Sequence, residues 1–185
     1  VEPGQGTDLL QVAAFSCGLS LFWCCLFAGL APFGAPKGIS FVWWGSIACH
    51  IAFFTCFALF SCFVAHLPFG VMGRQVSNNA KMLVAVSAAA FAAFGAATGA
   101  GLDIPVWVRI AVKALGGVGA ACLLFLWVPC IALVGRETLI ASLSASAIGG
   151  SVFALGLDAM EGGAPCFFLA AAALACLGLA ERVRR

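Results

Sequence analysis

The segment 116–134 reads GGVGAACLLFLWVPCIALV and contains no charged residue. With the preceding segment 104–115 (IPVWVRIAVKAL), it exceeds the roughly 20 apolar residues that a helix needs to cross a bilayer at about 1.5 Å per residue. Five other long apolar segments resemble it. These segments predict an all-α integral membrane protein, built as a bundle of six transmembrane helices.

The composition supports the same class. Of the 185 residues, 64% are hydrophobic and 9% are charged, whereas a soluble domain usually has about 25% charged residues. So few charged side chains cannot cover the surface, and we therefore expect the lipid bilayer to surround the protein. The net charge of +2 does not indicate nucleic-acid binding.

Proline, glycine and charged residues separate the apolar runs into six predicted spans. They cover residues 9–31, 39–67, 81–101, 105–135, 138–157 and 164–180. A polar loop with the sequence GVMGRQVSNNAK precedes the third span, with Ser77, Asn78 and Asn79 as candidate helix caps. Residues 1–8 lack the features of a signal peptide and form an N-terminal segment, while 181–185 form a basic tail. Because the chain begins with valine, we expect it to belong to a longer protein.

The distribution of positive charges predicts the orientation. With the N-terminus inside, the inner segments hold twice as many basic residues as the outer ones, which favours both termini in the cytoplasm of a cell-membrane protein. Trp43, Trp44 and Trp107 fall at the outer helix ends, where indole rings prefer the headgroup zone. The inner residues are Arg74, Lys81, Arg136, Arg182, Arg184 and Arg185, and the outer ones are Lys37, Arg109 and Lys113.

Small residues are expected to bring the helices together, because expulsion of water cannot do so inside a membrane. Gly95 and Gly99 form a GxxxG motif in the third span, and Ser142, Ser146 and Gly150 form a small-residue row in the fifth. The first two spans are instead rich in phenylalanine and tryptophan. Large side chains that fill the gaps beside small ones explain this combination, and a ligand-lined cavity is the alternative.

The ten cysteines lie in or at the edges of apolar runs, and none belongs to a CxxC pair. Cysteine packs as a small apolar residue, so this pattern predicts neither a metal site nor a redox site. The chain also lacks HExxH, GxSxG and Walker motifs and paired carboxylates within the membrane. We therefore predict neither enzymatic activity nor a cofactor.

Two ionisable positions lie within predicted spans. His50 can hydrogen-bond to a serine or carbonyl and serve packing alone, or it can contact a ligand or take part in proton coupling. Arg109 and Lys113 are four residues apart and share a helix face. Either both reach the outer interface near Asp103, or Lys113 points into a cavity and binds an anionic group.

Aromatic residues supply the remaining site candidates. Trp127 and Pro129 occur together late in the fourth span, where the proline can kink the helix as a hinge or as a static feature. A small apolar ligand between the aromatic first two helices and the fourth would favour one packing of the bundle. The predicted ligand contacts are His50, Lys113, Trp23, Trp127 and Phe54, with Pro129 as the hinge.

The segments 17–32 (CGLSLFWCCLFAGLAP) and 116–155 (GGVGAACLLFLWVPCIALVGRETLIASLSASAIGGSVFAL) carry a family resemblance. A glycine-rich opening, the pair Leu126 and Trp127, and a small-residue fifth helix follow in this order. The pattern resembles the membrane half of bacterial LuxR-type helix-turn-helix regulators, which have a major-facilitator-like helical region. The resemblance implies a sensory or anchoring domain that contacts no nucleic acid itself.

The loop before the third span resembles a second family. Gly70 and Arg74 match two positions of the GxxxDRxGRR-type motif of major-facilitator transporters, whereas the acidic residue and paired basic residues of that motif are absent. Six spans with both ends inside also resemble one half of that fold. This resemblance implies half of a secondary transporter, completed by a second six-helix half, or a small carrier acting as a homodimer. A structural assembly subunit is the third alternative.

Overall fold

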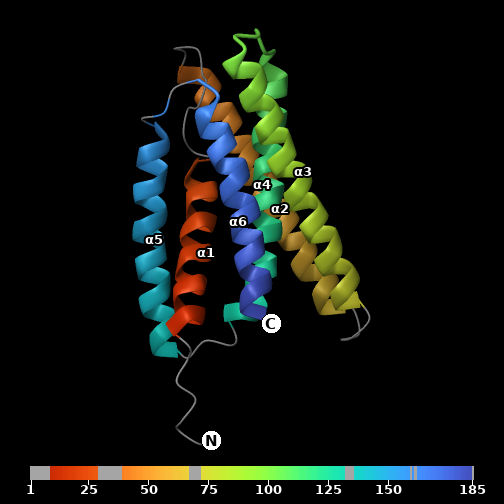
Figure 1. Cartoon of the computed structure of the whole chain (residues 1–185). Coiled ribbons are helices and arrows are strands. Elements are labelled where there is room, and N and C mark those ends of the chain that lie inside the picture. Colours follow the sequence, from red (N-terminus) through yellow and green to blue (C-terminus); the bar gives the residue numbers. More distant parts are fainter. Residues whose placement is uncertain are drawn as a thin grey trace, which may run out of the picture.

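The computed structural model describes residues 9–28, 39–66, 72–131, 136–158, 160 and 162–184. Predictions concerning residues 1–8, Lys37 and Arg185 lie outside these residues, as do the side chains of Trp43, Trp44, Arg74, Arg136 and Arg184. The described chain forms six helices (Figure 1): α1 (Leu9–Ala28), α2 (Ile39–His66), α3 (Met72–Gly99), α4 (Val106–Ile131), α5 (Arg136–Asp158) and α6 (Ala164–Arg184).

Every regular element within the described ranges is an α-helix, which confirms the predicted all-helical class. Helices α2 to α6 are each long and apolar enough to cross a bilayer. In α1 the apolar part with described side chains is shorter, Ala13–Cys25. The architecture is therefore that of a multi-span membrane protein.

The third helix begins nine residues earlier than predicted. It starts at Met72, so the predicted loop over 72–80 is wrong, and so are the caps Ser77, Asn78 and Asn79, which lie inside the helix. Polarity shows where a segment leaves the lipid, but it does not end a helix when no proline interrupts it and good helix formers are present. The polar turns extend α3 by about 13 Å beyond its predicted start.

The sixth helix likewise continues beyond its predicted end at residue 180, through most of the predicted basic tail, to Arg184. Val183 is buried, and Glu181 forms an ion pair with Lys81 of α3 at 2.5 Å. The polar extensions of α3 and α6 therefore pack together and hold the last turn of α6 in helical form.

Helix α4 lies at the centre of the bundle and packs against α1, α2, α3 and α6. Helix α1 packs against α5 and α6, and α3 packs against α6. Among the described residues, α2 has extensive contacts with α4 alone, and α5 packs mainly on α1 (Figure 1). The bundle therefore has peripheral helices, α2 and α5, on either side of a central group.

Most packing pairs repeat when α1, α2 and α3 are exchanged for α4, α5 and α6, but the α4 and α6 pair has no comparable counterpart between α1 and α3 in the described part of the chain. The α2 and α4 pair corresponds to α5 and α1, and the α3 and α4 pair corresponds to α6 and α1. The exchange leaves the α1 and α4 pair unchanged, and likewise the α3 and α6 pair. Each set has an odd number of helices, and Figure 1 shows α1 beginning and α6 ending at the same end of the bundle. The two sets therefore run in opposite directions, as in an inverted repeat.

Large side chains fill the space beside glycines, as predicted. A Cβ atom built on Gly18 of α1 would lie 2.1 Å from the Trp127 ring of α4. One built on Gly150 of α5 would lie 2.4 Å from the Cβ of Trp23 in α1. Each glycine therefore allows two helices to approach more closely than any larger residue would.

The two predicted small-residue rows differ in use. Ser142, Ser146 and Gly150 are all buried, and Gly150 contacts α1, which confirms this row as a packing face. In α3, Gly95 packs against the backbone of Gly163, the residue before α6, whereas a Cβ built on Gly99 would meet no heavy atom of the described residues within 4 Å. The GxxxG motif therefore contributes only its first glycine to packing.

The connection between α3 and α4 sets the start of α4. Gly101 has a φ of 70°, a left-handed conformation that favours glycine. Its N–H donates to the Thr98 carbonyl at 3.0 Å, and the Leu102 N–H donates to the Ala97 carbonyl at 3.1 Å. This is the hydrogen-bond pattern of a Schellman motif, which ends α3 before Pro105 opens α4.

Candidate functional site

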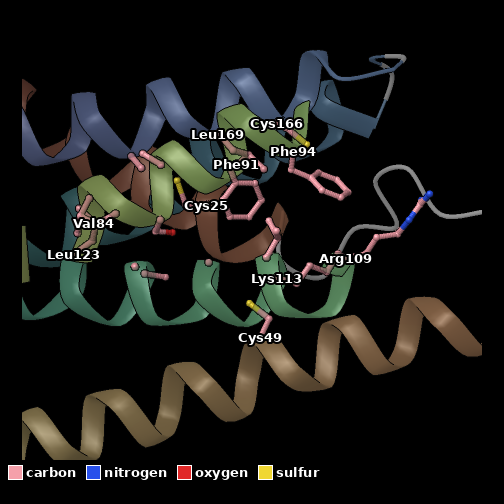
Figure 2. Close-up of a pocket in the computed structure, with 17 residues that line it drawn as sticks. Cys25, Cys49, Val84, Phe91, Phe94, Arg109, Lys113, Leu123, Cys166 and Leu169 are labelled. Carbon is pink, nitrogen blue, oxygen red and sulfur yellow. The ribbon is translucent and has the colours of Figure 1, made fainter. Parts of the chain in front are cut away.

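A cavity of about 50 Å³ lies where α1, α2, α3, α4 and α6 converge (Figure 2). On this measure it has room for roughly three to five water-sized groups. Most of its wall is apolar, with Phe91 and Phe94 of α3 beside Leu169 of α6. Lys113 and Arg109 of α4 are its charged lining residues within the described part of the chain.

Lys113 is a cationic residue within the apolar helix α4. It is half-buried and follows Val106, the first residue of α4, by about 10 Å along the helix axis. Its stem lies against α2, because a Cβ built on Gly45 would be 2.8 Å from the Lys113 Cδ. The glycine at position 45 therefore makes room for the lysine at position 113.

Arg109 lines the mouth of the same cavity but is held differently. Its Nε donates a hydrogen bond to the Ile104 carbonyl at 3.0 Å. Figure 2 shows its guanidinium extending away from the other labelled residues, toward the loop end of the bundle. The sequence leaves two interpretations of Arg109 and Lys113 open. The structure corresponds to the one in which Lys113 lines a cavity. The anionic ligand of that interpretation is still a prediction.

Glycines of α4 shape the wall that faces α3. A Cβ built on Gly116 would lie 2.7 Å from the Phe91 ring, and one built on Gly119 would lie 2.6 Å from the Ser87 Oγ. Ser87 is buried and contributes a hydroxyl group to the lining. The close approach of α3 and α4 therefore depends on these glycines and sets the width of the cavity.

Three thiols also line the cavity: Cys25 of α1, Cys49 of α2 and Cys166 of α6. All ten cysteines of the chain are free. Among the described residues, no group of three or more histidine, cysteine, aspartate or glutamate side chains is placed to hold a metal ion. Here the thiols supply soft, weakly polar surface within a mostly apolar cavity.

The structure does not bring the five predicted ligand contacts together. Lys113 lines the cavity, whereas His50 lies half-buried on α2 and donates from Nδ1 to the Ser46 carbonyl at 2.7 Å. This bond corresponds to the packing interpretation of His50. Phe54 is 63% exposed on the outer face of α2, where it stacks edge-on against Phe53.

The two predicted tryptophans lie at helix contacts and outside the cavity lining. Trp23 packs beside Gly150 at the contact of α1 and α5. Trp127 is fully buried, and its Nε1 donates to the Cys176 Sγ at 3.1 Å. Pro129, the predicted hinge, is exposed and lies two residues before the end of α4 at Ile131.

Several lining residues were missed by sequence reasoning, above all Ser87, Phe91 and Phe94 of α3. Ser87 is a polar residue in an alanine-rich helix, and the phenylalanines recur at a three-residue interval. These signals indicate a helix face, but they do not identify the helices that it meets. Only the packing of α3 against α4 and α6 turns that face into a cavity wall.

No family model, curated protein or solved structure matches this chain.

Proposed function

We propose that the chain is a membrane-embedded sensory domain that binds a small, mostly apolar molecule in the Lys113 cavity. The observation that carries the proposal is the cavity itself, a mostly apolar space with the cationic residues Lys113 and Arg109 of α4 in its lining. Binding sites for small molecules combine an apolar wall with few polar groups in this way.

The position of the cavity suggests how occupancy would change the bundle. Its wall takes residues from both three-helix sets, from α1, α2 and α3 of the first set and from α4 and α6 of the second. A ligand with unequal affinity for two packings of these sets shifts the population toward the packing that it prefers. A connected output domain would respond to this shift, as the resemblance to LuxR-type regulators implies.

A pair of adjacent alanines gives a direct test. Ala88 is buried and lines the cavity, whereas Ala89 is exposed on α3. We expect binding compounds to raise the unfolding temperature of the purified wild type and of Ala89→Leu, but not of Ala88→Leu, whose side chain fills the cavity. The proposal fails if no small apolar compound shifts the wild type, or if Ala88→Leu responds as the wild type does.

A carrier for a small solute is the second candidate, favoured by the inverted-repeat packing of α1–α3 and α4–α6. Secondary transporters commonly bind substrate between such repeats and alternate its access by rocking one against the other. Flux of a bound compound into proteoliposomes, faster than into protein-free vesicles, supports the carrier. Binding without flux supports the sensory domain.

The proposal includes a location in the cell membrane with both chain ends in the cytoplasm. Two features support it. Lys81 pairs with Glu181, which precedes Arg182 near the end of α6, and Figure 1 shows α1 beginning at the same end of the bundle. The exposed Trp107 lies in the first turn of α4, near the opposite end. The proposal also includes that the six helices form one half of a major-facilitator fold. The packing pairs shared by α1–α3 and α4–α6 support this part of the proposal.

A further inference from the structure

We propose that the cavity binds a small uncharged hydrogen-bond acceptor, an ether or carbonyl compound with short alkyl groups, whose oxygen accepts a hydrogen bond from the Ser87 hydroxyl of α3. This inference rests on the proposed function and specifies the chemistry of its ligand. Three features of the site carry it: the hydrogen bonding of Ser87, the depth at which Ser87 lies, and the size of the cavity.

The hydroxyl of Ser87 differs from others in the bundle. A serine or threonine inside a helix can donate to the carbonyl one turn earlier, as Ser20, Thr98 and Ser151 do here at 2.8–2.9 Å. Ser87 is only 5% exposed, yet its hydroxyl has no hydrogen-bond partner among the described residues. A buried donor without a partner is costly, and a bound acceptor removes that cost.

The Ser87 hydroxyl is directed across the contact between α3 and α4. A Cβ built on Gly119 of α4 would lie 2.6 Å from the Ser87 Oγ, and both residues line the cavity. Because Gly119 has no side chain, the hydroxyl lies beside the α4 backbone with no α4 side chain at this position to cover it. A ligand in the cavity can therefore reach the hydroxyl.

The position of Ser87 favours an uncharged ligand. Val84 and Phe91 share its face of α3, at spacings of three and four residues, and both line the cavity. Its neighbour across the contact, Gly119, is six residues beyond Lys113, which is about 9 Å along the axis of α4. A charged group would lose most of its hydration at this depth, whereas an uncharged oxygen needs a single donor.

The serine hydroxyl favours a ligand that accepts and does not donate. An ether, ketone or ester has acceptor oxygens alone, so it satisfies the hydroxyl donor without adding a donor of its own. An alcohol or an amide would bring an O–H or N–H group that needs a second partner within a mostly apolar wall.

The size of the cavity favours a short molecule. A volume of about 50 Å³ accommodates roughly three to five water-sized groups, which is close to the five non-hydrogen atoms of diethyl ether. The side chains of Phe91 and Leu169 provide an apolar wall for the alkyl groups. A long chain would require the helices to separate.

Diethyl ether and n-pentane test the inference, because they have the same number of non-hydrogen atoms and the same chain shape, and the ether alone has an acceptor. Each compound is titrated against the purified full chain in an uncharged detergent and followed by ligand-detected NMR in sealed tubes. Comparison of variants at equal ligand and detergent concentrations cancels the partition of each compound into micelles. We expect Ser87→Ala to bind the ether about three- to tenfold more weakly than wild type and to bind pentane at least as well.

Ser151→Ala is the matched control, because Ser151 is exposed on α5 and donates to the Ala147 carbonyl at 2.9 Å. It should bind both compounds as wild type does. Ser87→Ala should unfold at the wild-type temperature or above, since it loses no hydrogen bond among the described residues and gains a better helix former. A lower unfolding temperature would show that the hydroxyl has a partner in the protein, which overturns the inference.

An ether affinity of Ser87→Ala equal to that of wild type also overturns the inference. It leaves the proposed function standing where wild type binds both compounds and Ala88→Leu binds neither, because an apolar ligand then still occupies the cavity. Failure of wild type to bind either compound overturns the inference and counts against the proposed function as well.

Discussion

Replacement of Gly117 by alanine should loosen the contact between α2 and α4. A Cβ atom at this position would lie 2.1 Å from the Cys49 carbonyl oxygen of α2, whereas ordinary contacts begin at 3.4 Å. The obstructing atom belongs to the backbone, so no side chain can rotate away, and α2 must move by more than an ångström. Overpacking of this kind typically costs about 1–3 kcal/mol. Since α2 packs extensively on α4 alone among the described helices, we expect about 2 kcal/mol, within that range.

Thermal unfolding in a mild detergent measures this effect. For a chain of this length, a loss of about 2 kcal/mol corresponds to a fall in Tm of roughly 4–8 °C. Gly178→Ala is the matched control, because a Cβ built on this helical glycine of α6 would meet no heavy atom within 4 Å among the residues that the structure describes. Its Tm should stay unchanged or rise slightly, since alanine is the better helix former. Equal stability of Gly117→Ala and wild type would refute the predicted contact of α2 with α4.

Four further substitutions test the packing. Trp127→Ala should lower the free energy of unfolding by about 3–5 kcal/mol, because it empties a fully buried site and removes the donor to Cys176. A free energy of unfolding within about 1 kcal/mol of that of wild type would contradict this expectation. Phe53→Ala should cost a similar amount in denaturant titration, whereas Phe54→Ala, which truncates a 63% exposed side chain, should cost less than about 1 kcal/mol. Lys81→Gln should cost less than about 1 kcal/mol, with the difference shrinking at high salt, because the ion pair that it breaks is partly exposed.

Much of the helical architecture could be predicted from the apolar runs, because lipid requires long, continuous apolar helices. The ends of α3 and α6 could not. In both, helix continues into polar residues that leave the apolar region, and the pairing of Lys81 with Glu181 joins segments separated by about half the sequence. The sequence of neither segment indicates which helix it will contact.

The site was harder to predict than the helices. Helix α2 is apolar all round, so its sequence does not reveal that Phe53 is buried while Phe54 faces outward. Lys113 could be selected because a charge in an apolar run is rare. Its surroundings, Gly45 and Phe91 among them, depend on α2 packing against α4 and on α3 packing against α4. The first of these pairs joins parallel helices that are not consecutive in the chain.

The claim most directly open to measurement is that the bundle crosses the bilayer with α1 beginning and α6 ending on one side. Leu102 lies exposed in the turn between α3 and α4, and Arg182 lies exposed near the end of α6. A membrane-impermeant thiol reagent applied to sealed vesicles should label Leu102→Cys and Arg182→Cys from opposite sides. Unsubstituted protein supplies the background from the native cysteines. Labelling of both positions from the same side would contradict the crossing and the function inferred from it.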